Sequence, residues 1–248
     1  MTLHALRFAI ALSLLASIGG DGARRASAWA AEPVDVELVL AADGSGSIDD
    51  EELRLQREGY ARAVTHPRVL EVITSGYHRS IAIAFVEWGG ALSQHTIVDW
   101  HRIHDEASAR AFAAALLAAP RAARGYNSIS GAIDYAAALI RNNAFDGANK
   151  VIDVSGDGPQ IGGRPLAVSR MEAMAEGITI NGLVVKSRGG GYPGPRGEPL
   201  EEHYENDVIG GPGSFVMIAD EQLSFADAIL NKLILEVASR PSRQSARR

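Results

Sequence analysis

Apolar runs of strand length alternate along the chain with longer segments of helical hydrophobic spacing. The apolar runs predict buried strands at residues 34–42, 80–88, 94–100, 150–155, 178–185 and 215–218. The segments of helical spacing predict helices at residues 50–64, 69–73, 105–119, 128–142, 165–176 and 222–238. A short loop joins the second and third strands and predicts a hairpin. The remaining alternation predicts an α/β fold: a doubly wound, mostly parallel sheet with helices on both faces.

The chain divides into three parts along its length. Residues 1–31 have the pattern of a signal peptide, because one arginine precedes an apolar run at 8–18 and small-residue cleavage sites follow. Residues 32–238 form the predicted domain, and the arginine-rich tail at residues 239–248 is expected to be disordered. A membrane tether or a disordered N-terminus is the alternative to a signal peptide. Signal cleavage predicts a periplasmic or secreted protein with no integral membrane segment.

Composition narrows the class of function. The chain has 248 residues, of which 46% are apolar and 22% charged, as is ordinary for a globular domain. Its formal net charge of −6 argues against nucleic-acid binding. The absence of cysteine excludes disulfides, zinc–thiolate sites and a cysteine nucleophile. The domain must therefore rely on its hydrophobic core for stability.

The strongest candidate chemistry follows the first predicted strand. Asp43, Ser45 and Ser47 place a carboxylate and two hydroxyls at alternate positions of a loop. Asp157 lies in a Gly-flanked turn directly after the strand at residues 150–155. Ligands in parallel sheets bind outside the carboxyl ends of the strands, so these loops are expected to converge. Their hard oxygen atoms suit Mg²⁺, Mn²⁺ or Ca²⁺.

This pattern resembles the metal-ion-dependent adhesion site of von Willebrand factor A domains, and the order of strands and helices is similar over residues 34–238. The run at residues 208–216 also resembles an exported bacterial branch of that superfamily, of unassigned function. The resemblance implies a Rossmann-like fold and a Mg²⁺ or Mn²⁺ ion held by two serines, a threonine and two aspartates. One position on the ion is left open for a partner's carboxylate. The residues that match this pattern are Asp43, Ser45, Ser47 and Asp157.

The threonine of the family is absent, and this leaves the site open to two interpretations. Its place, before the helix predicted at residues 128–142, is held by Asn127, with Ser128 beside it. An amide oxygen or a hydroxyl can coordinate a hard cation, which favours a working site. If neither keeps the affinity and geometry of the threonine, the site is weak or lost.

Three functions compete. The first is an exported, non-enzymatic module that captures a protein with an exposed acidic residue, because two aspartates and neutral hydroxyls leave a bound cation electrophilic. The second is a structural domain with a degenerate metal site. The third is a metal-dependent hydrolase such as a phosphatase, which is weakened because Ser45, not a second aspartate, lies two residues after Asp43. Gly-x-Ser-x-Gly and His-Glu-x-x-His motifs are absent.

The other polar groups are expected to be structural. The four acids at residues 49–52 predict a charged helix start. Asp153 lies inside a predicted strand, and the seven histidines are expected at surface or loop positions. Residues 187–213 are rich in Gly and Pro and are expected to form an excursion with the polar stretch 201–207 inside it.

Overall fold

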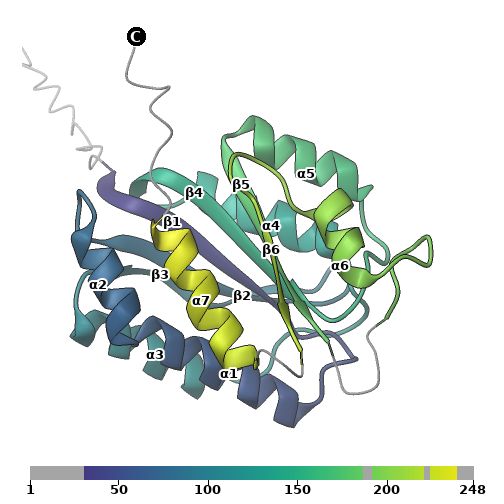
Figure 1. Ribbon diagram of the computed structural model, residues 1–248, viewed down its shortest axis with the longest axis horizontal. Helices are drawn as coiled ribbons and strands as arrows, with labels where there is room; N and C mark the ends of the chain where they lie inside the picture. Colours follow the sequence, from purple (N-terminus) through teal and green to yellow (C-terminus); the bar gives the residue numbers. More distant parts are fainter. Residues whose placement is uncertain (1–30, 187–191, 221–223, 239–248) are drawn as a thin grey trace, which may run out of the picture. The chain divides into compact units, whose positions relative to one another are not determined.

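The computed structural model describes residues 31–186, 192–220 and 224–238 (Figure 1). These residues form a six-stranded sheet in the order β3-β2-β1-β4-β5-β6. Its strands are β1 (Glu32–Asp43), β2 (Ile81–Trp88), β3 (Gln94–Ile103), β4 (Phe145–Gly156), β5 (Ile178–Val185) and β6 (Val216–Ala219). The first 30 residues of the expected signal peptide and the expected tail at 239–248 lie outside the described residues.

All neighbouring strands are parallel except β3, which pairs with β2 in the antiparallel direction. The predicted hairpin and the predicted mostly parallel sheet are thus confirmed. The described helices are α1 (Asp50–Val64), α2 (Pro67–Ser75), α3 (Glu106–Ala118), α4 (Ile129–Arg141), α5 (Leu166–Ala175), α6 (Leu200–His203) and α7 (Phe225–Ala238), with a π-helical turn η1 (Tyr204–Val208). None of them is long and apolar enough to cross a bilayer.

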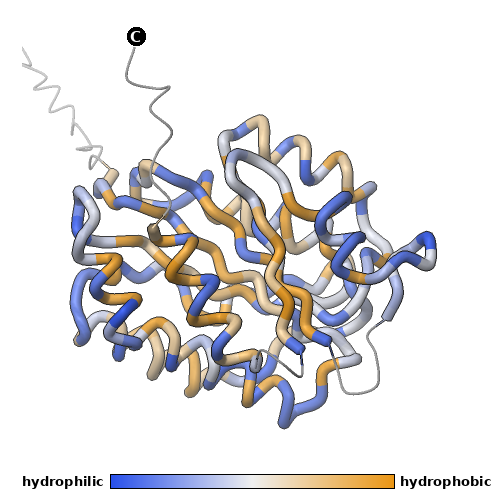
Figure 2. Tube along the Cα trace, viewed as in Figure 1, coloured by the Kyte–Doolittle hydropathy of each residue, from blue (hydrophilic) through white to orange (hydrophobic). Residues whose placement is uncertain are grey.

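The helices form a layer on each face of the sheet. On one face α1, α2, α3 and α7 enclose one core, and on the other α4, α5, α6 and η1 enclose a second (Figure 1). The central strand β1 supplies both cores, because its side chains alternate between faces. Leu38 and Leu40 enter the first core, whereas Val39 and Ala41 enter the second. Figure 2 shows this as apolar strands between helices that are polar on their outer sides.

The stretch after residue 192 is more ordered than its composition suggests. The expected excursion contains α6 and η1, two helical segments that the sequence analysis did not predict. Leu200, Tyr204 and Val208 recur every four residues and pack into the second core, which supplies the burial that stabilises this helical turn. His203 is also buried there, contrary to the expected surface or loop position.

Candidate metal centre

The first loop of the site begins where β1 leaves the sheet. Asp43 is the last residue of β1 and is fully buried. Its Oδ1 accepts a hydrogen bond from the backbone N–H of Ser45 at 2.7 Å, which turns the chain sharply after the strand. The loop then enters α1 through a capping box, in which Asp49 and Glu52 each bind the other's backbone N–H. The acidic helix start that the sequence predicts is therefore confirmed as a cap.

The second loop, between α3 and α4, is joined by backbone hydrogen bonds to the first loop and to the turn after β2. Gly46 N–H donates to the carbonyl of Gly125 at 2.9 Å, and Ser128 N–H donates to the carbonyl of Gly89 at 2.8 Å. Gly125 has φ of +88°, a left-handed conformation that favours glycine. This turn brings Asn127 to the end of β1.

One arginine fixes the first loop from the second. A terminal nitrogen of Arg121 donates to the carbonyls of Gly44, Ser45 and Ile48 at 3.1, 2.9 and 2.7 Å. Its other terminal nitrogen donates to Asp50 at 2.9 Å. The planar guanidinium can hold several carbonyls at once, so Arg121 sets the shape of the loop that carries the two serines.

The third loop follows β4 and closes the cluster. Ser47 Oγ donates to Asp157 Oδ1 at 3.0 Å, and the Ser45 and Ser47 hydroxyls lie 3.0 Å apart. Asn127 Nδ2 donates to Asp43 Oδ2 at 3.4 Å. Five of the six residues singled out in the sequence thus lie within one hydrogen-bonded cluster at the carboxyl ends of β1 and β4.

Ser128 is placed differently from the other five. It is the N-cap of α4, where its hydroxyl accepts from Gly131 N–H at 3.3 Å and donates to the carbonyl of Gly162 at 3.4 Å. These contacts engage the hydroxyl in capping the helix and holding the loop after Asp157. Ser128 therefore supports the cluster through the backbone.

Electrostatics make the cluster costly without a cation. Burial raises the pKa of Asp43, the backbone N–H of Ser45 lowers it in part, and the charge of Asp157 raises it again, to about 7. Two carboxylates held together in a buried place repel each other. A divalent cation between them would remove this penalty, because it favours the charged form of both.

Tyr204 is a site residue that the sequence analysis missed. Its buried hydroxyl has no hydrogen-bond partner among the described residues. A methyl group added to Gly156 would lie 2.7 Å from this hydroxyl and 3.2 Å from Asp43 Oδ2, so the hydroxyl flanks the cluster. Burial, followed by the charges of Asp43 and Asp157, raises the pKa of Tyr204 well above its usual value, and the hydroxyl stays protonated.

The donor set fits a hard divalent cation on three observations. Its side chains offer carboxylate, hydroxyl and amide oxygens, which are the ligands of Mg²⁺ and Mn²⁺. Burial, and to a smaller extent the charge of Asp157, raises the pKa of Asp43 to about 7, and a bound cation would offset both effects. The unpartnered hydroxyl of Tyr204 offers a polar group to a water or ligand beside that charge.

A second acidic group, formed by Glu198, His203 and Asp207, already has an arginine as its partner. Its candidate ligand atoms lie within 4.8 Å of one another. The guanidinium of Arg196 lies 2.8 Å from Asp207 and 3.2 Å from Glu198. His203 Nδ1 lies 2.9 Å from Asp207, while its Nε2 accepts from the backbone N–H of Gln160 at 3.3 Å. One guanidinium thus pairs with both carboxylates, and His203 tethers the loop that follows Asp157.

Comparisons with solved structures agree with this architecture. A pilus adhesin, SpaC from Lactobacillus rhamnosus GG, in its open conformation, has a TM-score of 0.57 and 14% identity, covering 82% of this chain and 30% of its own. A von Willebrand factor type A protein from Catenulispora acidiphila has a TM-score of 0.55 and 16% identity. The match covers 83% of this chain and 42% of that protein. Proximal thread matrix protein 1 from the mussel byssus, with a zinc-occupied metal-ion-dependent adhesion site, has a TM-score of 0.53 and 15% identity, covering 84% and 46%.

This chain therefore spans less than half the length of each of those proteins, and the likeness at such low identity shows the fold. No curated protein matches the sequence. One family model, described as "Protein of unknown function (DUF1194)", matches residues 33–241, which is most of the chain. The chain belongs to this family and has the doubly wound fold of von Willebrand factor A domains.

Proposed function

We propose that this chain is an exported, non-enzymatic protein-binding module with a divalent-metal adhesion site. Asp43, Ser45, Ser47 and Asp157 would hold the cation, Mg²⁺, Mn²⁺ or Ca²⁺, with Asn127 in the place of the family's threonine. The convergence of these side chains at one end of the sheet carries the proposal. The presence of a pilus adhesin and a matrix protein among the structures of this fold supports it.

The chemistry of the proposed binding follows from charge and hydrogen bonding. Two aspartates only balance the charge of a divalent cation, so the bound ion can accept one further carboxylate from a partner. Ser45 and Ser47 are neutral and can turn their hydroxyl lone pairs toward the ion. Arg121 holds the backbone of their loop in place, so little conformational entropy of the loop is lost when the cation binds.

The proposal includes export because residues 1–31 are expected to be a signal peptide. Divalent metal then comes from the surroundings of the protein. Sequencing the N-terminus of the exported protein tests this part, with cleavage expected after Ala28 or Ala30.

Thermal melts of the purified protein test the metal site. With a Kd of about 0.1 mM, 1 mM Mg²⁺ or Mn²⁺ adds roughly 1.4 kcal/mol of stability, a Tm rise of about 3–5 °C over EDTA. The Asp43→Ala variant is expected to lose this shift. Asp146→Ala, an exposed aspartate at the far end of β4, is the matched control and should keep it. A wild-type Tm that is the same with and without millimolar metal contradicts the proposal.

One observation favours a degenerate site as the second candidate. The nitrogen of the Asn127 amide faces the Asp43 carboxylate, so a donor occupies the place where a ligand oxygen is needed. The two ends of an amide differ little in shape, and a cation would select the orientation with the oxygen inward. Substitution of Asn127 therefore separates the two candidates.

A further inference from the structure

A hollow of about 740 Å³ opens directly beside the metal cluster. Ser47 and Asn127, two of the proposed ligands, form part of its wall. Tyr126, Ile161 and Tyr192 form another part. Its volume lies within the usual range of ligand pockets, so it can hold at least one large side chain next to a bound carboxylate.

The side chains around this hollow are unusually exposed for their type. Tyr126 is 77% exposed, Tyr192 is 59% exposed and Ile161 is 48% exposed. Single exposed apolar residues are common, but three from separate loops at one functional cluster are typical of an interaction site. Among the described residues that line the hollow, none is Asp, Glu, Lys, Arg or His.

Hydrogen bonds connect one side of the hollow to the proposed ligands. The backbone N–H of Ile161 donates to the carbonyl of Asn127 at 2.5 Å. The side chain of Gln160 binds both the backbone N–H and the hydroxyl of Ser130 at 2.9 Å, and its backbone N–H binds His203. Ile161 is therefore tied to the ligand candidate Asn127, which gives this side of the hollow a defined spacing from the metal cluster and favours a ligand with two groups at that spacing.

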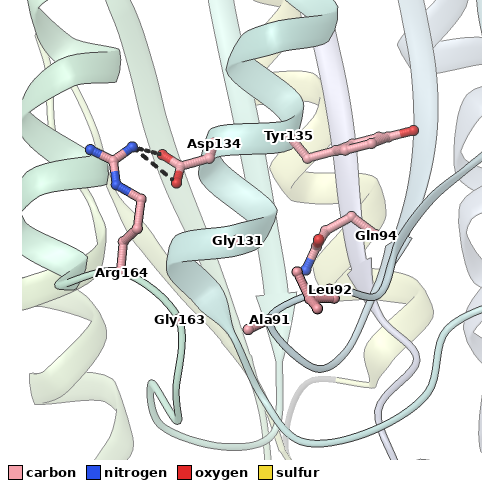
Figure 3. A pocket seen from close by; sticks show the side chains of 8 residues that line it. All are labelled: Ala91, Leu92, Gln94, Gly131, Asp134, Tyr135, Gly163 and Arg164. Atoms are coloured by element: carbon pink, nitrogen blue, oxygen red, sulfur yellow. Dashed lines mark hydrogen bonds and ion pairs between the residues drawn. The ribbon is translucent and has the colours of Figure 1, made fainter.

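A neighbouring hollow of about 540 Å³ has a different character (Figure 3). Arg164 and Asp134 face each other on one side of it and form an ion pair at 3.2 Å, while Leu92 and Gln94 lie across from them. None of the proposed metal ligands lines it. A partner side chain next to a carboxylate bound at the metal cluster would therefore enter the first hollow and not this one.

We propose that the partner presents an acidic residue next to a bulky apolar or aromatic residue. The carboxylate would bind at the metal cluster, and the apolar side chain would fill the hollow between Tyr126, Ile161 and Tyr192. Burial of apolar area contributes about 25 cal/mol per Å², which a lone carboxylate contact in water lacks. A charged neighbour would lose its hydration there without gaining a charged partner. This inference rests on the proposed function and specifies its partner.

A peptide library tests the inference. Peptides with one fixed Asp or Glu and randomised neighbours are displayed and selected on the wild-type protein with Mn²⁺ or with EDTA. Selection with Mn²⁺ is expected to enrich an aromatic or large aliphatic residue within two positions of the acid. A selected peptide should bind at least about tenfold more weakly to the Tyr126→Ala and Ile161→Ser double variant, as for truncation of a binding hot spot.

A control variant and a separate measurement of metal binding distinguish failure of this inference from failure of the proposed function. Tyr77→Ala removes an exposed tyrosine (91%) before β2, at the other end of the sheet, and should leave peptide affinity unchanged. The Mn²⁺-induced Tm shift reports on the metal site of each variant independently of peptide. If the double variant loses this shift, the peptide measurement is made instead with Tyr192→Ala, which changes a different segment of the hollow.

Metal-dependent enrichment of the acid without an apolar neighbour overturns the inference and leaves the proposed function standing. Equal peptide affinity in wild type and in the variants of the hollow overturns it too. An absence of metal-dependent acid enrichment on the wild-type protein contradicts the proposed function, and the inference falls with it.

Discussion

Asn127 is the residue at which the proposed metal site departs from the pattern of von Willebrand factor A domains. It is buried, its amide nitrogen lies 3.4 Å from Asp43 Oδ2, and a methyl group on Gly158 would collide with it. The amide therefore has little room to move, although rotation about its last bond exchanges oxygen and nitrogen. A hydroxyl in the same place would offer oxygen lone pairs to a cation in every rotamer, and its single O–H could still donate to Asp43.

We predict that Asn127→Thr binds Mg²⁺ about tenfold more tightly than the wild type. Tenfold corresponds to about 1.4 kcal/mol, which is within the range of a single hydrogen-bonded or coordinated group. The Kd is obtained from Tm as a function of metal concentration. Asn127→Ala is the control, and it should bind metal more weakly than the wild type if the amide oxygen is a ligand. Equal affinity in all three proteins would show that position 127 does not contact the cation.

At the residue scale the sequence predicts the ligands because their pattern is local. Asp43, Ser45 and Ser47 are recognisable from their spacing after an apolar run, and Asp157 from its Gly-flanked turn. Tyr204 gives no comparable signal, because its hydroxyl reaches the cluster from a segment 47 positions beyond Asp157. Only the packing of η1 on the sheet brings it there.

Loops rather than helices or strands position the site, and Arg121 connects two of them. Its guanidinium satisfies three carbonyls of the loop between β1 and α1. A buried arginine, Arg57, also supports this loop: it binds Glu87 at 2.9 Å, and Glu87 accepts from Ala122 N–H at 3.1 Å. The loop after α3 is thus anchored to β2 through buried charge.

We predict that Arg121→Ala weakens Mg²⁺ binding roughly tenfold and lowers the unfolding free energy by about 1–2 kcal/mol, because carbonyls bound by a charged group lose their partner. Arg121→Lys should recover little affinity, since a point charge cannot hold three carbonyls in a fixed plane. Arg141→Ala, which breaks an exposed pair with Glu176, is the control. Metal titrations followed by thermal melts measure both effects. Wild-type affinity in Arg121→Ala would refute the positioning role.

At the scale of elements, most boundaries follow from the hydrophobic pattern. The helix predicted at residues 50–64 is α1, and the strand predicted at 178–185 is β5. The strand predicted at 150–155 is the end of β4, which starts at Phe145. The hydrophobic pattern does not indicate the first half of β4, because the residues before Lys150 are largely polar. This half lies near the edge of the core and is stabilised by its pairing with β1.

A buried ionic group joins α7 to the sheet. Lys232 Nζ lies 2.8 Å from Asp153 of β4 and also binds Glu236, one turn further along α7. Asn181 of β5 donates to Glu236 at 2.9 Å. Burial lowers the pKa of Lys232, but the two carboxylates raise it more, so the ammonium stays charged. Asp153 is structural, as the sequence analysis expected.

This group predicts a pH dependence of the stability of the whole domain. Burial and the charge of Asp153 raise the pKa of Glu236 from 4.5 to about 7, against the lowering effect of Lys232. The folded state therefore binds the proton more tightly than the unfolded state. The resulting stability is fully present below pH 4.5 and is lost as the pH rises to about 7.

We predict that Glu236→Gln removes the part of this dependence that Glu236 contributes, while Asp153, whose pKa burial also raises, keeps its own part. The variant is expected to gain roughly 3 kcal/mol of stability relative to wild type between pH 4.5 and 7. Gln keeps an oxygen for Lys232 and Asn181, so the packing is preserved. Urea unfolding at several pH values measures the difference between the two proteins. Parallel stability curves across this range would contradict the assignment.

The sequence by itself determined most of the strands and helices, the sheet type and six ligand candidates, because hydrophobic period and loop spacing are properties of neighbouring residues. Tertiary structure alone decided which of those candidates meet, that Ser128 caps a helix, and that Tyr204 joins the cluster. It also decided the apolar hollow and the burial of Lys232. These depend on contacts between distant segments, whose approach is fixed by how the two cores pack against the sheet.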